Sequence, residues 1–144
     1  MKKQITLAFA LIAGVFTVSC NEDDDPKFEN IDRMAGEWQL TKIGTLNGSA
    51  INYTNVGSCA PSLSFADSSF VQVDATLVDE ACQTTTFSGL YGIEDGNLVL
   101  YYDDMTEATA DILTLTDKEL ELVENDTETN SLTFLRYRKV TPTE

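Results

Sequence analysis

Hydrophobic residues recur at every second position over most of the chain from residue 36 onward. Leu98, Leu100 and Tyr102, for example, alternate with their neighbours directly after an Asp-Gly pair, which favours a tight hairpin turn. A period of two places alternate side chains on opposite faces of a β-strand, whereas an amphipathic helix needs a period near 3.6. The pattern therefore predicts an all-β domain.

The predicted strands are short and are separated by polar turns. A helical turn is expected only within residues 29–35, before Gly36. Many short strands with polar turns are typical of a sandwich or a closed barrel, and the pattern alone does not choose between them. The expected strands are Glu37 to Thr45, Ser62 to Ala66, Ser69 to Leu77, Phe87 to Ile93, Leu98 to Tyr102, Ala108 to Thr116, Glu119 to Leu122 and Leu132 to Val140, with a weaker candidate at Ile51 to Thr54.

The N-terminal segment has the pattern of an export signal. Two lysines precede an apolar run from Ile5 to Val18, which is too short to span a bilayer as a helix. The run ends in Val18-Ser19-Cys20, which resembles the lipobox of bacterial lipoproteins. This resemblance implies a signal peptide over residues 1–19, which is removed, and a lipidated Cys20 as the new N-terminus. An unmodified or disulfide-bonded Cys20 is the alternative.

An acidic segment follows Cys20 and predicts an extended tether over residues 20–33. It resembles the acidic signal that sends some lipoproteins of Gram-negative bacteria to the outer face of the outer membrane. We therefore expect a lipid-anchored outer-membrane protein that is exposed at the cell surface. The alternative is a plain spacer on a protein that faces the periplasm. Several acyl chains, palmitate among them, would hold Cys20 firmly without help from the folded domain.

The charge balance excludes several classes of function. Nine Lys and Arg residues stand against 24 Asp and Glu residues, giving a net charge of −15, and the chain has no His. Proteins that bind nucleic acid need clustered basic residues to displace counterions from phosphates, so nucleic acid is not expected as a partner. Without His there is no Ser-His or Cys-His nucleophile pair and no imidazole metal ligand.

Two further cysteines, Cys59 and Cys82, are candidates for a disulfide because an exported chain meets an oxidising compartment. Chain-entropy arguments assign a bridge of this span about 3 kcal/mol of stabilisation. Free buried thiols or a metal-binding pair are the alternatives. Two cysteines without His make a poor zinc site.

An ordered set of motifs resembles the lipocalin-like domains of bacterial lipoproteins. The set comprises Gly36-Glu37-Trp38-Gln39-Leu40, a cysteine before Leu63-Ser64-Phe65, a second cysteine, Gly89-Leu90-Tyr91-Gly92-Ile93, Asn97-Leu98-Val99-Leu100, Ile112-Leu113-Thr114-Leu115-Thr116, Leu120-Glu121-Leu122 and a final aromatic and basic strand. This resemblance implies an antiparallel up-and-down barrel of about eight strands over residues 34–141. It also implies that Trp38, two residues after Gly36, plugs the closed end, with Arg136 or Arg138 over its ring.

Three classes of function remain. The first is a binding protein that holds a small apolar ligand inside the barrel, as lipocalins do. The second is an envelope or surface interaction module with a filled barrel, whose protein partner the sequence does not name. Catalysis is not expected, because the acid pairs Asp79-Glu80 and Asp103-Asp104 lie in turns or strand ends and form no acid/base dyad. Calcium at Asp103, Asp104 and Glu107 lacks the spacing of a known calcium loop, so no metal site or cofactor is expected.

Overall fold

The computed structural model describes residues 32–142, and the predicted signal peptide, Cys20 and most of the predicted tether lie outside this range. Residues 32–34 form a helical turn that runs directly into the first strand. No helix within 32–142 is long and apolar enough to cross a membrane. Nine strands make up the rest of the described fold: β1 (Gly36–Asn47), β2 (Ala50–Asn55), β3 (Ser62–Ala66), β4 (Ser69–Val78), β5 (Ala81–Glu94), β6 (Asn97–Tyr102), β7 (Glu107–Leu115), β8 (Glu119–Asp126) and β9 (Ser131–Lys139).

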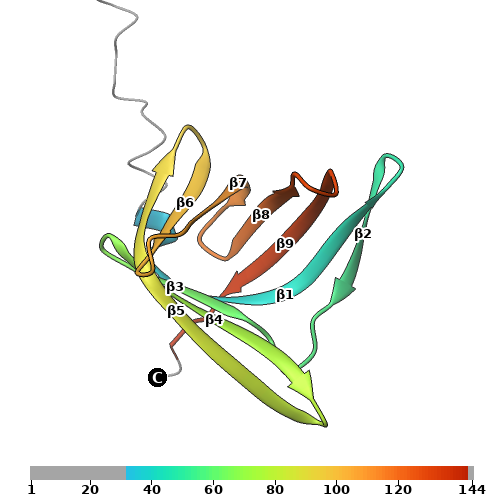
Figure 1. Cartoon of the computed structure of the whole chain (residues 1–144), viewed down its shortest axis with the longest axis horizontal. Coiled ribbons are helices and arrows are strands. Elements are labelled where there is room, and N and C mark those ends of the chain that lie inside the picture. The colour runs from blue at the N-terminus through green and yellow to red at the C-terminus, as the bar shows by residue number, and fades with distance from the viewer. Residues whose placement is uncertain (1–31, 143–144) are drawn as a thin grey trace, which may run out of the picture.

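The strands form one antiparallel sheet that closes into a barrel (Figure 1). Strands β3 to β9 pair in sequence order, and β9 returns to pair with β1. Strand β1 pairs with β3 through its first residues and with β2 through its second half, so β2 and β3 together occupy one position beside β1. The described residues therefore form an all-β, eight-stranded, up-and-down antiparallel barrel, as the resemblance of the motifs implies.

Each predicted strand is present, but β5 is longer than expected. It begins at Ala81 rather than near Phe87 and pairs with β4 over its whole first half. Residues 81–88 are exposed on both faces of the sheet, because this half of the β4–β5 hairpin extends past the end of β3. Without a buried face the segment has no hydrophobic alternation. Its run of threonines, which favour strands, is the remaining sequence signal.

The two ends of the barrel differ in how the chain connects the strands. Because neighbouring strands are antiparallel, the turns after β3, β5 and β7 lie at the end where the helical turn enters β1, and the hairpin tips after β4, β6 and β8 lie at the other end. The β4–β5 tip is the two-residue turn Asp79-Glu80, both with positive φ (48° and 66°), which matches the right-handed twist of the flanking strands. This acid pair therefore shapes a hairpin, in keeping with its expected turn position.

A disulfide joins Cys59 to Cys82, with 5.5 Å between their Cα atoms, and confirms the predicted pairing. Cys59 lies in the connection between β2 and β3, and Cys82 lies near the start of β5. The β2–β3 connection lies beside the first half of β5, which extends beyond the end of β3. The bridge therefore fastens the extended β4–β5 hairpin to the β2–β3 side of the barrel.

The hydrophobic core lies at the end that holds the helical turn, called here the closed end. Directly paired residues on neighbouring strands share a face, so the register identifies the inward-facing set. Inward apolar side chains from seven strands and from the helical turn pack there against one another. They are Met34, Trp38, Leu40, Leu63, Phe65, Phe70, Tyr91, Ile93, Leu98, Leu100, Leu120, Leu122 and Tyr137.

Gly89 is required by the close approach of β5 and β6. A Cβ atom at this position would lie 1.9 Å from the carbonyl oxygen of Tyr101, which belongs to the backbone and has little freedom to move. We expect Gly89→Ala to destabilise the protein by about 1–3 kcal/mol through this overlap. Gly92 in the same strand is the matched control, because a Cβ atom there would meet nothing within 4 Å. Urea unfolding checks the pair, and equal midpoints for the two variants would contradict the expectation.

Candidate functional site

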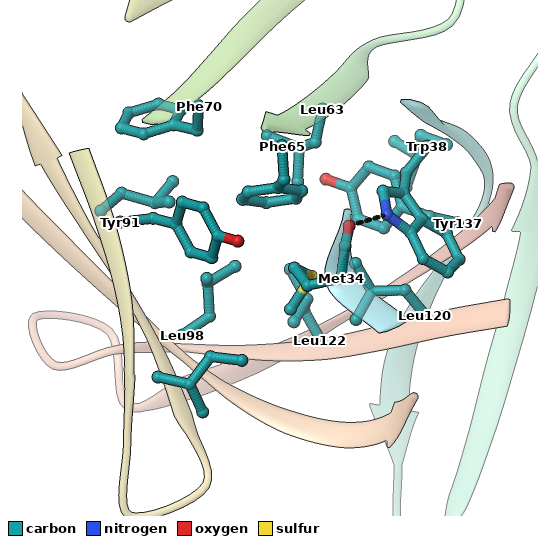
Figure 2. Packing of buried hydrophobic residues seen from close by; sticks show 13 residues of the cluster. Met34, Trp38, Leu63, Phe65, Phe70, Tyr91, Leu98, Leu120, Leu122 and Tyr137 are labelled. Atoms are coloured by element: carbon teal, nitrogen blue, oxygen red, sulfur yellow. Dashed lines mark hydrogen bonds between the residues drawn. The ribbon is translucent and has the colours of Figure 1, made fainter. Parts of the chain in front are cut away.

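Trp38 seals the closed end of the barrel. Its side chain has no exposed surface, and its indole Nε1 donates a hydrogen bond of 2.8 Å to the carbonyl oxygen of Met34. Figure 2 shows this bond between the first strand and the helical turn, with Leu120 and Tyr137 beside the indole. Burial removes the large ring from water, and the hydrogen bond satisfies its one donor. The helical turn is thereby fixed across the end of the barrel.

The cation over the Trp38 ring is Lys139, so the predicted role of Arg136 or Arg138 is wrong. The Nζ of Lys139 lies 4.9 Å from the ring centroid and donates a hydrogen bond of 3.1 Å to the carbonyl oxygen of Arg33. A Cβ atom on Gly36 would lie 2.8 Å from Cε of Lys139, so this glycine leaves room for the lysine stem. The register explains the error, because Lys139 is the direct partner of Trp38 and shares its inward face.

Arg136 instead belongs to a polar cluster on the outer face of the barrel. Its guanidinium carbon lies 4.2 Å from the centroid of the Tyr53 ring, and its Nη2 lies 3.4 Å from the carboxylate of Glu121. The Tyr53 hydroxyl also donates to Glu121, which is only 4% exposed. Gly44 allows the tyrosine to cross β1, because a Cβ atom there would lie 2.8 Å from the ring. Arg138 is exposed on this outer face.

A cavity of about 80 Å³ lies inside the barrel above the closed-end core. Its apolar wall comes from β3, β6, β7 and β8, and Tyr137 of β9 contributes to its lining. Four polar residues, Ser62, Gln72, Asp74 and Glu124, also line it, together with the phenol of Tyr102. Beyond it, an open hollow of about 190 Å³ shares Gln72, Asp74 and Tyr102 with the cavity. The apolar lining residues are Pro61, Leu63, Leu98, Leu100, Ala108, Ala110 and Leu122.

The polar groups of the cavity form a directed set of hydrogen bonds. The Tyr102 hydroxyl donates to Oε1 of Gln72 at 2.7 Å, and Nε2 of Gln72 donates to Oδ1 of Asp74 at 2.7 Å. Glu124 lies across the barrel on β8 and remains accessible to solvent through the open end. Within residues 32–142, neither carboxylate pairs with a Lys or Arg side chain. The cavity therefore combines apolar walls with two uncompensated acids.

The charge of Asp74 acts on Glu124, and both acids act on the neighbouring phenols. Partial removal from water raises the pKa of Glu124, and the negative charge of Asp74 raises it further. Burial likewise raises the pKa of Tyr137, with smaller contributions from Glu124 and Asp74, so its phenol stays protonated at neutral pH. The Tyr137 side chain is 6% exposed. Its hydroxyl forms no hydrogen bond with a described residue, but it is not among the polar atoms that are fully sealed from solvent.

The raised pKa of Glu124 predicts how stability depends on pH. The folded state holds the Glu124 proton more tightly than the unfolded state. The free energy of unfolding therefore falls as pH rises from the ordinary pKa of a glutamate to above the raised pKa of Glu124. Glu124→Gln removes this dependence. We therefore expect the variant to gain stability over the wild type at about pH 7 but not at about pH 4, where the carboxyl group is largely neutral in both states.

Urea midpoints of the two proteins at both pH values measure the effect. Glu128→Gln, in the exposed β8–β9 turn, is the control and should show no such change between the two pH values. A gain for Glu124→Gln of equal size at both pH values would show that charge on this group is not the cause.

The turn acids Asp103 and Asp104 accept local hydrogen bonds. Asp104 accepts hydrogen bonds from the backbone N–H and the hydroxyl of Thr106, and the hydroxyl bond is the larger cause of its lowered pKa. Asp103 accepts a hydrogen bond of 2.6 Å from the Ser88 hydroxyl. Over residues 32–142, no group of three or more acidic, Cys or His side chains is placed to hold a metal.

Sequence reasoning missed the acids inside the barrel, although a signal for them exists. Gln72 and Asp74 follow Phe70 at the inward spacing of two, and Glu124 follows Leu122 in the same way. Polar residues in the register of a core face are unusual, because that face is normally apolar. Alternation therefore identifies the three positions once one residue of each strand is known to face inward.

Comparison with known structures finds several similar chains. A crystal structure of an uncharacterized protein from Bacteroides eggerthii DSM 20697 is 19% identical with a TM-score of 0.52, over 74% of this chain and 99% of that chain. Bovine odorant binding protein in complex with a selenium-containing odorant is 16% identical with a TM-score of 0.48, over 79% and 74% of the two chains. The siderocalin Ex-FABP is 11% identical with a TM-score of 0.47, over 78% and 77%.

The search of curated proteins found no match to this chain. A family model gives the more direct result, because it rests on the sequence itself and spans the Gly36-x-Trp38 strand, both bridged cysteines and most of the cavity wall. The model that describes the lipocalin-like domain matches residues 34–122, which is more than half of the chain, and the protein therefore belongs to the lipocalin-like domain family.

Proposed function

We propose that this protein is a membrane-anchored lipocalin-like lipoprotein that binds a small ligand inside its barrel. Lipocalin-like folds typically bind small hydrophobic ligands, and members of the family are generally binding proteins rather than enzymes. The observation that carries the proposal is the cavity of about 80 Å³, with apolar walls and an opening at one end. An apolar cavity of about 150 Å³ holds benzene, so a space of this size suits the tail of a small ligand rather than a large lipid.

A cavity-filling variant tests ligand binding. Ala110 lines the cavity, and Ala110→Leu adds about three carbon atoms to that space. Thr109→Leu is the matched control, because Thr109 is exposed on the outer face of the same strand. We expect native mass spectrometry of protein purified gently from its own host to show a bound small molecule in the wild type and in Thr109→Leu, but not in Ala110→Leu. Equal ligand occupancy in all three proteins would place the ligand elsewhere.

The anchored location is also proposed, and it rests on the N-terminal sequence. The lipobox-like Val18-Ser19-Cys20 supports attachment through Cys20, and the acidic segment after it supports display at the cell surface. Cells fed a clickable fatty acid should label the wild-type protein and not Cys20→Ala. Protease treatment of intact cells should degrade the protein together with a known surface marker. Protection of the protein while the marker is cut would place it on the periplasmic side.

A further inference from the structure

We propose, on the basis of the ligand-binding function above, that the barrel selects a small amphipathic cation: a short apolar tail with a protonated amine head. The head would lie between Asp74 of β4 and Glu124 of β8, and the tail would lie against the apolar wall below them. Each step rests on a different property of the cavity.

The first property is charge. Asp74 and Glu124 both line the same cavity, and within residues 32–142 no Lys or Arg side chain lines it with them. Glu124 loses part of its hydration and lies near the negative charge of Asp74, and both effects disfavour its ionised form unless a cation or hydrogen-bond donors compensate it. Gln72 gives Asp74 one donor, whereas Glu124 receives no hydrogen bond from a described residue. An ammonium group supplies both a positive charge and three N–H donors.

The second property is an unused polar group deep in the same cavity. Tyr137 is more than nine-tenths buried and lines the cavity, and its hydroxyl forms no hydrogen bond with a described residue. Figure 2 shows its hydroxyl directed away from Trp38, toward Leu63 and Phe65 inside the barrel. Unlike the Tyr91 hydroxyl, this oxygen is not sealed from solvent, so a polar group inside the cavity can reach it. A protonated amine can donate to this oxygen as well as to the carboxylates.

The third property is the long-range field. The chain carries a net charge of −15, and the open end of the barrel presents the acids of the β4–β5 and β6–β7 tips. A field of one sign around a cleft raises the local concentration of the oppositely charged ligand. An anionic ligand, such as a fatty acid, would instead meet repulsion both outside the barrel and at Asp74 and Glu124. The structure therefore favours cations over the anions that would fit equally well by size.

Three probes with the same tail and different heads test the inference: n-butylamine, which is protonated at neutral pH, 1-butanol and butanoate. Binding is followed by chemical-shift changes of the wild-type protein and of an Asp74→Asn/Glu124→Gln variant. We expect n-butylammonium to bind the wild type at least about tenfold more tightly than 1-butanol, and butanoate to bind most weakly. In the variant, n-butylammonium and 1-butanol should bind about equally tightly. Asp111→Asn, on the outer face of β7, is the control and should keep the preference.

The outcomes separate the two proposals. Binding of 1-butanol as tight as that of n-butylammonium, or a preference that survives in the double variant, would overturn the cation selectivity while leaving the binding function intact. Absence of binding by all three probes would overturn both. The double variant is expected to fold, because it removes two charges of the same sign and leaves an acceptor for the Gln72 amide.

Discussion

Trp38→Ala should lower the free energy of unfolding by about 3–5 kcal/mol, the largest effect expected of a single substitution in this chain. The side chain is fully buried, donates to the carbonyl of Met34 and lies under the ammonium group of Lys139. Truncation leaves a cavity at the closed end, removes the donor of a buried hydrogen bond and releases the helical turn. Urea unfolding followed by circular dichroism measures the loss.

Met105→Ala is the control, because Met105 is 97% exposed and its truncation should change stability by less than about 0.5 kcal/mol. Trp38→Phe separates the two contributions at the closed end. It keeps an aromatic ring but leaves the Met34 carbonyl without its donor, so its stability should fall between those of the wild type and Trp38→Ala. A loss below about 1 kcal/mol for Trp38→Ala would mean that the closed end is not the stabilising centre of the barrel.

Loss of the disulfide should cost about 3 kcal/mol, since the bridge removes loop-closure entropy from the unfolded chain. The structural consequence should be local. Cys59 and Cys82 join the β2–β3 connection to the extended half of β5, whose residues 81–88 are exposed on both faces. In a Cys59→Ala/Cys82→Ala variant we therefore expect faster amide hydrogen exchange in this half of the β4–β5 hairpin than in the closed-end core.

Reductant supplies the matched control for this variant. The wild type in reductant should fall to the stability of the double variant, whereas the variant should not respond. A wild type that loses no stability on complete reduction would show that pairing along β4 and β5 alone maintains this side of the barrel.

Sequence alternation predicted the strands well because most of them have one buried face. The start of strand β1 shows this clearly, because Trp38 and Leu40 are buried while Gln39 between them is exposed. The first half of β5 escaped prediction because neither of its faces is buried. The choice of barrel over sandwich came from the resemblance of the motifs, since alternation does not record which strands pair at the ends of a sheet.

The site was harder to predict than the fold. Cysteine and tryptophan are rare residue types, so the sequence could single out Cys59, Cys82 and Trp38. In the structure the cysteines form the disulfide at the β4–β5 hairpin, and Trp38 seals the closed end. The cation over Trp38 depends on the register between β1 and β9, which the β-bulge between Leu40 and Lys42 shifts by one residue. A single strand read alone does not contain that shift. Asp74 and Glu124 likewise come to line one cavity only because the barrel closes, which neither strand alone predicts.

The position of a bound probe inside the barrel is the most direct test of ligand binding. In an NMR experiment on the wild type with n-butylamine, intermolecular nuclear Overhauser effects report which side chains the butyl group contacts. We expect the terminal methyl group to contact Leu98 and Leu122, which line the cavity, because the amine remains near the acids above them. Contacts confined to exposed outer residues such as Leu90 or Leu113 would contradict ligand binding within the barrel.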